Sequence, residues 1–237
     1  MERRLFGRTV FIPLNGLSVT RRLEFSTLMK YLDLKGDELV LDVACGDGYW
    51  SARMIPKTGA VVGFDFNMNR LQQARRLARG FRGTVRCDAH ALPFRDGIFD
   101  RSVGMCVLEH FRDDVQALNE LRRVIKPGGI LALTVDSFSY PGISQVEKEK
   151  HARIFSVVHL YQLDDLKKKL EGTGFQLAKW SYLLRSPISA SLYHFAIRFP
   201  KLAYLLFPIS YPLSLWSERF SKNQTCGYKL AVAARAQ

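Results

Sequence analysis

The chain has 237 residues, of which 47% are hydrophobic, and its formal net charge is +13. This length and composition predict one α/β domain with a sizeable core. The four cysteines form no Cys-x-x-Cys pair, which argues against a metal site and for reduced thiols. The first residues lack the apolar core of a signal peptide, so we expect a cytoplasmic chain.

The basic excess lies in two segments. Residues 51–100 carry nine basic and four acidic side chains, and residues 151–237 carry twelve and four. A solvated helix face explains the first segment, while attraction to an anionic membrane or to nucleic acid is the alternative.

The chain opens with an irregular stretch over residues 1–22, which we interpret as a lid over a binding site. Ser18 or Thr20 then caps a predicted helix that runs to about Leu32. Leu28 and Leu32 fall on its buried face.

The most informative pattern spans residues 40–48. An apolar run there predicts a short buried strand, which stops at Gly46 and Gly48. Two glycines let the backbone turn sharply and approach a ligand, because neither carries a Cβ atom. The next apolar run ends at Asp65, at the distance where a carboxylate meets ribose hydroxyls in a βαβ nucleotide site.

Strands and helices alternate along the rest of the chain. We predict a helix at 68–79 capped by Asn67, strands at 84–87 and 99–107, a helix at 113–125, a strand at 130–135, a helix at 163–170 and an antiparallel pair of strands at 175–184 and 227–234. This order predicts an α/β fold with a doubly wound, mostly parallel sheet.

Two insertions depart from this alternation. Residues 137–160 contain His151 and His159, and we interpret them as an active-site insertion. Residues 185–221 mix aromatic and basic side chains, and their longest uncharged run has 16 residues, whereas a membrane-spanning helix needs about 20. This second insertion suits a segment in the bilayer interface or a cap over a lipid-like substrate. Plain cover for the sheet edge is the alternative.

Five motifs recur in a familiar order. They are LDVACGDG at 41–48, GFD at 63–65, CDAHALPF at 87–94, FD at 99–100 and LRRVIKPGG at 121–129. Together they resemble the class I S-adenosylmethionine-dependent methyltransferases, and most closely the small-molecule branch that includes quinone and sterol methyltransferases. The resemblance implies a seven-stranded Rossmann-like sheet with a C-terminal antiparallel strand.

The resemblance also implies S-adenosylmethionine as the cofactor and nine residues that bind it. They are Asp42 near the methionyl group, Ala44, Gly46 and Gly48 in the turn, Asp65 with Phe66 at the ribose, Asp88 with Ala89 at the adenine, and Met105 under the sulfonium. Each has a plainer interpretation: Asp65, for example, could cap the following helix, and Met105 could be ordinary core. Ala44 is a departure, because many relatives have glycine there; we expect the turn to persist with slightly less room for the cofactor.

Methyl transfer from this cofactor requires few catalytic groups on the protein. An in-line SN2 displacement on an activated methyl donor needs alignment and exclusion of water. A hydroxyl or enolisable carbon acceptor would also use a base, and Glu109, His110 and His151 are the candidates. His110 could instead cap the helix that begins near Asp113. We predict no metal.

The sequence therefore predicts a methyltransferase for a small or lipid-like acceptor, with an anionic membrane surface as a further partner. Nucleic acid is a disfavoured partner, because residues 105–108 lack the Asn/Asp-Pro-Pro-Tyr/Phe motif of many base-amine methyltransferases. The alternatives are an RNA or protein methyltransferase and a cofactor-binding protein without catalysis.

Overall fold

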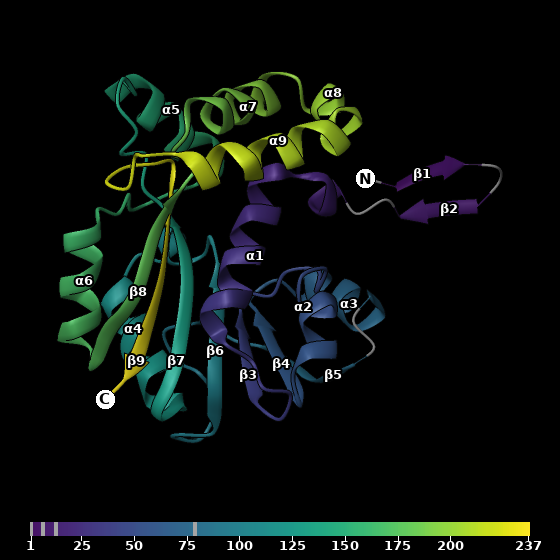
Figure 1. Cartoon of the computed structure of the whole chain (residues 1–237). Coiled ribbons are helices and arrows are strands. Elements are labelled where there is room, and N and C mark those ends of the chain that lie inside the picture. Colours follow the sequence, from purple (N-terminus) through teal and green to yellow (C-terminus); the bar gives the residue numbers. More distant parts are fainter. Residues whose placement is uncertain (1, 6–7, 12–13, 78–79) are drawn as a thin grey trace.

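The computed structural model describes residues 2–5, 8–11, 14–77 and 80–237 (Figure 1). The strands are β1 (Glu2–Leu5), β2 (Arg8–Phe11), β3 (Leu39–Val43), β4 (Ala60–Asp65), β5 (Phe81–Arg86), β6 (Phe99–Met105), β7 (Ile125–Asp136), β8 (Phe175–Leu183) and β9 (Lys229–Ala236). The α-helices are α1 (Val19–Leu32), α2 (Ser51–Met54), α3 (Met68–Leu77), α4 (Asp114–Val124), α5 (Gln145–Phe155), α6 (Leu163–Gly172), α7 (Pro187–Arg198), α8 (Pro200–Leu205) and α9 (Phe207–Phe220). Short 3-10 turns are η1 (Leu14–Leu17), η2 (Ile55–Lys57) and η3 (Leu108–His110).

Seven strands form one sheet in the order β5-β4-β3-β6-β7-β9-β8. The five strands from β5 to β7 are parallel, and β9 runs antiparallel to both of its neighbours. This topology confirms the predicted doubly wound, mostly parallel sheet with an antiparallel C-terminal strand. β1 and β2 pair with each other in a separate hairpin.

Local signals place the helices where they were expected. The Ser18 side chain accepts a hydrogen bond at the start of α1, and Asn67 and Asp113 do the same for α3 and α4. The helix after the glycine turn is short, because α2 ends at Met54, just before Pro56. Proline has no N–H and clashes with the preceding helical turn.

The sheet is covered on both faces. Leu41 packs with α4 and α6 in the larger core cluster, whereas the adjacent Val40 packs with Leu28 and Leu32 of α1 in a second cluster. Successive side chains of a strand point to opposite faces, so one short strand supplies both cores.

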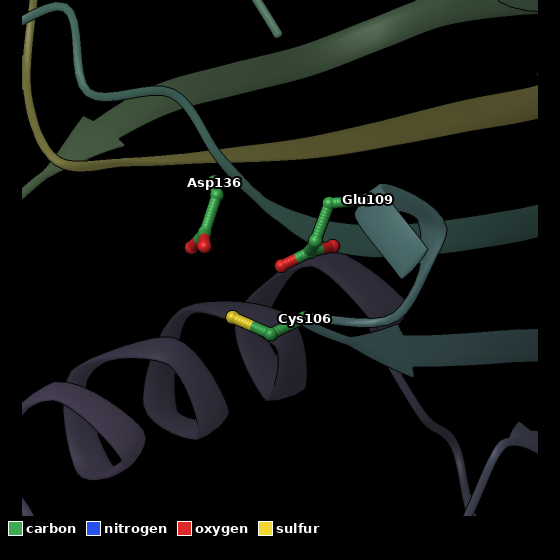
Figure 2. A group of neighbouring side chains, drawn as sticks. All are labelled: Cys106, Glu109 and Asp136. Carbon is green, nitrogen blue, oxygen red and sulfur yellow. The ribbon is translucent and has the colours of Figure 1, made fainter. Parts of the chain in front are cut away.

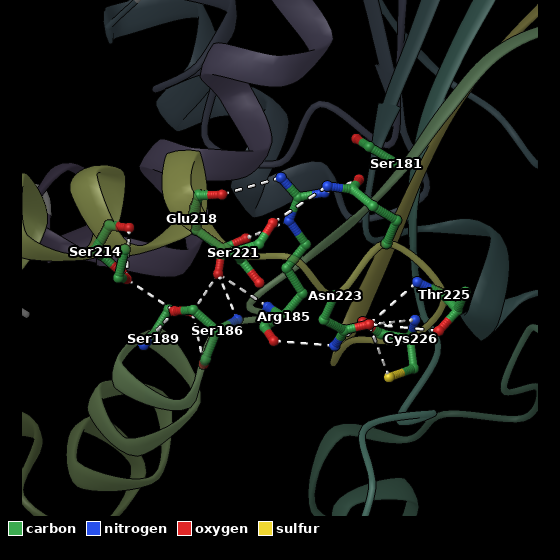
Figure 3. Close-up of polar contacts among 12 residues, drawn as sticks. Ser181, Arg185, Ser186, Ser189, Ser214, Glu218, Ser221, Asn223, Thr225 and Cys226 are labelled. Atoms are coloured by element: carbon green, nitrogen blue, oxygen red, sulfur yellow. Dashed lines mark hydrogen bonds and ion pairs between the residues drawn. The ribbon is translucent and has the colours of Figure 1, made fainter.

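Helices from the two insertions lie at the carboxyl edge of the sheet. Residues 137–160 contain α5, and residues 185–221 fold into α7, α8 and α9, which gather above α1 in Figure 1. Figure 3 shows the polar contacts that close the second insertion at its base. There the Glu218 carboxylate accepts hydrogen bonds from the N–H groups of Arg185 and Ser186 at 2.9 and 3.0 Å. Among the described residues, no helix is long and apolar enough to cross a membrane.

Candidate active site

One cavity of about 940 Å³ opens along the carboxyl edge of the sheet. Its strand-end residues are Asp65 of β4, Ala44 after β3, Cys106 after β6, Asp136 of β7 and Lys229 of β9. These strands are consecutive neighbours in the sheet, so the row of residues spans roughly 19 Å at the usual strand spacing. A single cavity therefore runs along the ends of the strands from β4 to β9.

The structure brings most, but not all, of the predicted site residues to this cavity. Those that line it are Ala44, Asp65, Phe66, Met105, Glu109, His110 and His151. Asp42, Gly46, Gly48, Asp88 and Ala89 are not among its lining residues. The predicted lid over residues 1–22 lies partly outside the described residues, and its described end, residues 17–21, also lines the cavity.

Asp65 ties the glycine turn to the next helix. Its carboxylate accepts hydrogen bonds from the N–H of Gly46 at 3.0 Å and from the N–H of Asn67 at 2.8 Å. A carboxylate has about four acceptor positions, so two are left for hydroxyl groups in the cavity. The helix-start role and a ribose-binding role are thus compatible in one side chain.

The turn itself depends on left-handed backbone. Gly46 and Gly48 have φ of 58° and 75°, and a Cβ atom on Gly48 would lie 3.0 Å from the backbone of Ala74. Ala44 also has a positive φ, of 49°. An L-residue pays roughly 1–2 kcal/mol in this region. The turn keeps its shape despite the alanine, as expected, but with strain that glycine would avoid.

Asp42 and Asp88 are held by neighbouring residues. Ser51 donates a hydrogen bond to the Asp42 carboxylate, and burial raises the pKa of Asp42 to about 7. The Asp88 carboxylate accepts a hydrogen bond from the N–H of His90 at 3.0 Å, and its oxygen lies 2.5 Å from Nδ1 of the same histidine. Asp42 therefore ties the end of β3 to the start of α2.

At the other end of the cavity lies a buried charge cluster that sequence reasoning largely missed. Its members are Arg21, Glu24, Cys106, Glu109, Asp136, His151 and Lys229. All except Arg21 are less than one-tenth exposed. Only Glu109 and His151 had been predicted as site residues.

Lys229 and Asp136 form the centre of the cluster. The Lys229 ammonium donates to the Asp136 carboxylate and to Sγ of Cys106, the latter at 3.3 Å. Nε2 of His151 lies 2.6 Å from the second oxygen of Asp136. Burial opposes ionisation of Asp136, but Lys229 outweighs it and holds the pKa of this carboxyl well below its usual range.

Glu24 and Arg21 form a second pair, on α1. Nη1 of Arg21 lies 3.3 Å from the Glu24 carboxylate, which is fully buried. The Cys106 thiol donates to the other Glu24 oxygen at 2.6 Å. Burial raises the pKa of Cys106 well above its ordinary value, so this group stays a thiol and acts as a donor.

Glu109 is the exception within the buried charge cluster. Its side chain is fully buried, it lines the cavity, and neither carboxyl oxygen has a hydrogen-bond partner among the described residues. Burial, and then the charge of Asp136, raise the pKa of Glu109 to about 8. At neutral pH this group is a neutral acid facing the cavity.

Figure 2 shows Cys106, Glu109 and Asp136 converging from the ends of β6, η3 and β7. Their ligand atoms lie within 4.8 Å of one another, a spacing that would suit a metal ion. The Lys229 ammonium already donates to two of the three, so a positive charge is present among them. A metal ion would have to displace it, and the absence of a metal stays a prediction.

His110 lies at the cavity wall and is exposed. Its Nδ1 atom is 3.1 Å from the carbonyl oxygen of Ser156, the residue that ends α5. Asp113, and not His110, caps α4, so the alternative helix-cap role of His110 is wrong.

Comparison with known proteins agrees with this geometry. Residues 41–133 match a family model described as a methyltransferase domain. Demethylmenaquinone methyltransferase of Staphylococcus saprophyticus is 35% identical over 109 residues, which cover 44% of this chain and 47% of that protein. The chain thus spans about half the length of such curated relatives.

Solved structures extend the likeness across the fold. Geranyl diphosphate C-methyltransferase of Streptomyces coelicolor, in complex with Mg²⁺, geranyl diphosphate and S-adenosyl-L-homocysteine, has a TM-score of 0.68 at 16% identity and covers 91% of this chain and 79% of its own. The [4+2]-cyclase SpnF has a TM-score of 0.63 at 21% identity, with 91% and 80% covered. Similarity at this level of identity concerns the fold alone, which a cyclase shares.

These findings agree with the predicted class: residues 41–133 match a methyltransferase domain, and the fold is shared with methyltransferases of known structure. The curated relatives that the chain matches over about half of their length include several demethylmenaquinone methyltransferases.

Proposed function

We propose that this protein transfers a methyl group from S-adenosylmethionine to a lipid-like acceptor whose reacting end is polar. The observation that carries the proposal is the continuity of one cavity. It joins Ala44 and Asp65 to the buried charge cluster and then to an apolar mouth between helices. A bound cofactor would supply the activated methyl group, and the chain's residues would hold and orient it and exclude water.

The cofactor end of the cavity fits a nucleoside. Asp65 has spare acceptor capacity for ribose hydroxyls, and Ala44 and Met105 provide small or apolar walls. Phe66 is 74% exposed at the rim, where a flat ring would suit an adenine. Both contacts of Asp88 with His90 use Oδ1, so its second carboxylate oxygen keeps acceptor capacity for an adenine amino group.

The opposite mouth of the cavity suits an apolar chain. Its walls come from α7, α8 and α9 and include Leu192, Phe195, Ile197, Leu206, Ile209 and Leu213. Of these side chains, Ile197, Leu206, Ile209 and Leu213 are each more than one-third exposed. An acceptor with an apolar tail would bury them, which favours binding by about 25 cal/mol per Å² of apolar surface.

Helix α9 has an unusual distribution of polarity. Its buried residues are Ser210, Ser214, Ser217 and Glu218, all of them polar. Its exposed residues include Ile209, Leu213, Trp216 and Phe220, at spacings of four, three and four that place them on one stripe. A helix that hides serines and exposes large apolar side chains is suited to an apolar environment outside the protein.

The charges around this stripe are basic. Arg198, Lys201, Arg219 and Lys222 are all exposed on or next to α7–α9. Basic residues beside exposed apolar rings favour an anionic bilayer surface, where each contributes about 1 kcal/mol. We infer that α8 and α9 rest on the membrane interface, so that a lipid-like acceptor enters the cavity directly.

Sedimentation with anionic liposomes tests the membrane part of this proposal. The wild-type protein should bind at low salt and dissociate as salt rises, because screening shortens the range of attraction. Changing the four basic residues to Gln should release it. A matched variant with Lys167, Lys168, Arg75 and Arg76 changed to Gln, which alters as many charges on other helices, should still bind. An equal loss of liposome binding in both variants would show that α8 and α9 only cover the edge of the sheet.

A second variant separates lipid from nucleic acid. Trp216→Ser with Phe220→Ser removes exposed rings but no charge. Liposome binding should drop, whereas RNA affinity carried by phosphate contacts would persist. Transfer of labelled methyl groups into lipid-soluble products tests the activity itself.

A further inference from the structure

We propose that Glu109 gives up its proton when the cofactor's sulfonium enters the cavity and then takes the proton of the acceptor. Cofactor binding would thereby prepare the catalytic base. The inference rests on the proposed methyltransferase function and adds to it a proton linkage between cofactor and base.

The position of Glu109 makes it available for this role. It lies in η3, four residues after Met105, the last residue of β6, and it lines the same cavity as Asp65. Its backbone carbonyl accepts hydrogen bonds from the N–H groups of Val158 and His159 at 2.8 and 3.2 Å, which hold the residue in place. Both side-chain oxygens are buried and lack partners among the described residues. A buried polar group in this state is costly unless a ligand satisfies it.

The surrounding charges leave Glu109 free to respond. The charged or titratable groups around it are Cys106 after β6, its neighbour His110, Asp136 of β7, Lys229 of β9, Arg21 and Glu24 of α1, His151 of α5 and Tyr161 before α6, with Tyr193 of α7 lining the same cavity. Arg21 pairs with Glu24, and Lys229 pairs with Asp136. These pairs cancel in charge, so the next unit charge that enters the cavity acts on Glu109.

S-adenosylmethionine brings such a charge, because its sulfonium is positive while its ammonium and carboxylate cancel. A unit charge within about 5 Å, at an effective dielectric constant of about 20, changes an ionisation constant roughly a hundredfold. Burial and Asp136 place the pKa of Glu109 at about 8, so the group is protonated at pH 7 without cofactor. With cofactor it would be mostly ionised. About 0.8 proton should leave per cofactor bound at pH 7.

The reaction then restores the starting state. As the acceptor's lone pair forms the new bond to the methyl carbon, the carbon–sulfur bond breaks and its electron pair stays on sulfur. The acceptor's proton passes to the Glu109 carboxylate. The products are the methylated acceptor, a neutral thioether and a protonated Glu109, so the proton released at cofactor binding is the one that the overall reaction yields.

Titration calorimetry at pH 7 in two buffers of different ionisation enthalpy measures this proton directly. Wild-type protein is titrated with S-adenosylmethionine and with S-adenosylhomocysteine, whose thioether is neutral. The amino groups of both ligands also titrate near neutral pH, so each ligand is compared between wild type and Glu109→Gln. With S-adenosylmethionine, the variant should release about 0.8 proton fewer per cofactor bound than wild type does. With S-adenosylhomocysteine, the two proteins should release nearly the same number of protons.

The outcomes separate the two claims. Absence of any binding heat with either ligand would refute the proposed function. Binding with the same proton count in wild type and Glu109→Gln would overturn the role of Glu109. Glu149→Gln, at an exposed position of α5, is the matched control and should release protons as wild type does.

A measurement on the wild-type protein covers the case in which Glu109→Gln fails to fold. Infrared difference spectra with ¹³C-labelled glutamate should show loss of a protonated carboxyl band when S-adenosylmethionine is added, and no loss with S-adenosylhomocysteine. An unchanged carboxyl band with saturating S-adenosylmethionine would contradict the proposal.

Discussion

The two ends of the cavity are built in different ways. At the cofactor end, the backbone determines the shape of the site. Glycines with left-handed backbone conformation form the turn, and the Asp65 carboxylate accepts hydrogen bonds from backbone N–H groups there. At the acceptor end, side chains from five elements meet in the buried charge cluster, and ion pairs hold them. The first arrangement buries few charges and so has a low desolvation cost. The second contains desolvated charges, each of which is stable only with its partner.

This difference predicts where mutations will affect stability and where they will affect binding. Removing one partner of an ion pair in the buried charge cluster should destabilise the protein, because it leaves the other charge without compensation. A change at the turn should leave the fold intact and weaken the binding of the cofactor. The four predictions that follow test this contrast, from the largest expected effect to the smallest.

Lys229→Met should have the largest effect. It removes the ammonium that compensates Asp136, which is 2% exposed. Breaking a buried ion pair costs about 3–5 kcal/mol of unfolding free energy. Urea denaturation measures this loss, with Lys222→Met, at an exposed position, as the control. Adding Asp136→Asn to Lys229→Met should recover much of the stability. A double variant as unstable as the single one would contradict the claim that Lys229 stabilises the fold by compensating Asp136.

Asp65→Ala should act mainly on the cofactor. Loss of charge-assisted hydrogen bonds to ribose should weaken S-adenosylmethionine binding by about 1.5–3 kcal/mol, or roughly ten- to a hundredfold. Calorimetry on folded protein measures it. Asp88→Ala is the comparison, since Asp88 contacts His90 and does not line the cavity. Equal losses in the two variants would show that the cofactor reaches further than the cavity does.

The sequence predicted one end of the cavity far better than the other. The turn and Asp65 lie within 25 residues of each other and carry their signal locally, in glycines, caps and a strand-end carboxylate. The Lys229–Asp136 pair joins residues 93 positions apart. It depends on the register of β9 against β7, which sets Asp136 opposite Lys229. This ion pair could have been predicted only from the correct antiparallel register. The one local indication in the sequence was a lysine at the start of a mostly apolar strand.

The helices of the second insertion show the same limit. Their aromatic and basic composition predicted a cap or an interfacial segment, and the structure shows helices at the cavity mouth. Which side chains face outward could not be predicted, because the serine face of α9 is decided by contacts with α7. Ser186 of α7's cap and Ser217 of α9 lie 2.8 Å apart, oxygen to oxygen.

Glu109→Gln should change the pH dependence of stability. The folded state holds a proton on Glu109 up to a pKa of about 8, whereas the unfolded chain loses it near pH 4.5. The wild-type protein therefore loses stability as pH rises through this interval, and a neutral glutamine does not. Urea denaturation should find the variant equal to wild type within error at pH 4.5 and at least about 2 kcal/mol more stable relative to it at pH 8.5. A constant difference at both pH values would rule out a buried, protonated Glu109.

Ala44→Gly should have the smallest effect. Glycine adopts the φ of 49° without strain but loses more chain entropy on folding, so the net gain should be about 0.5 kcal/mol. Ala152→Gly, inside α5, is the matched control and should cost about 1 kcal/mol. Thermal unfolding compares the two. A loss of similar size at both positions would mean that residue 44 carries no strain.

The most direct test of the proposed function follows a labelled methyl group. The wild-type protein is incubated with methyl-tritiated S-adenosylmethionine and, in separate reactions, with a lipid extract of the organism that encodes it, with its RNA and with its soluble proteins. We predict label in an organic-soluble product, formed by wild type and lost in Asp65→Ala. Label confined to RNA or protein, or no transfer to any fraction by a protein that binds the cofactor, would contradict a methyltransferase of lipid-like acceptors.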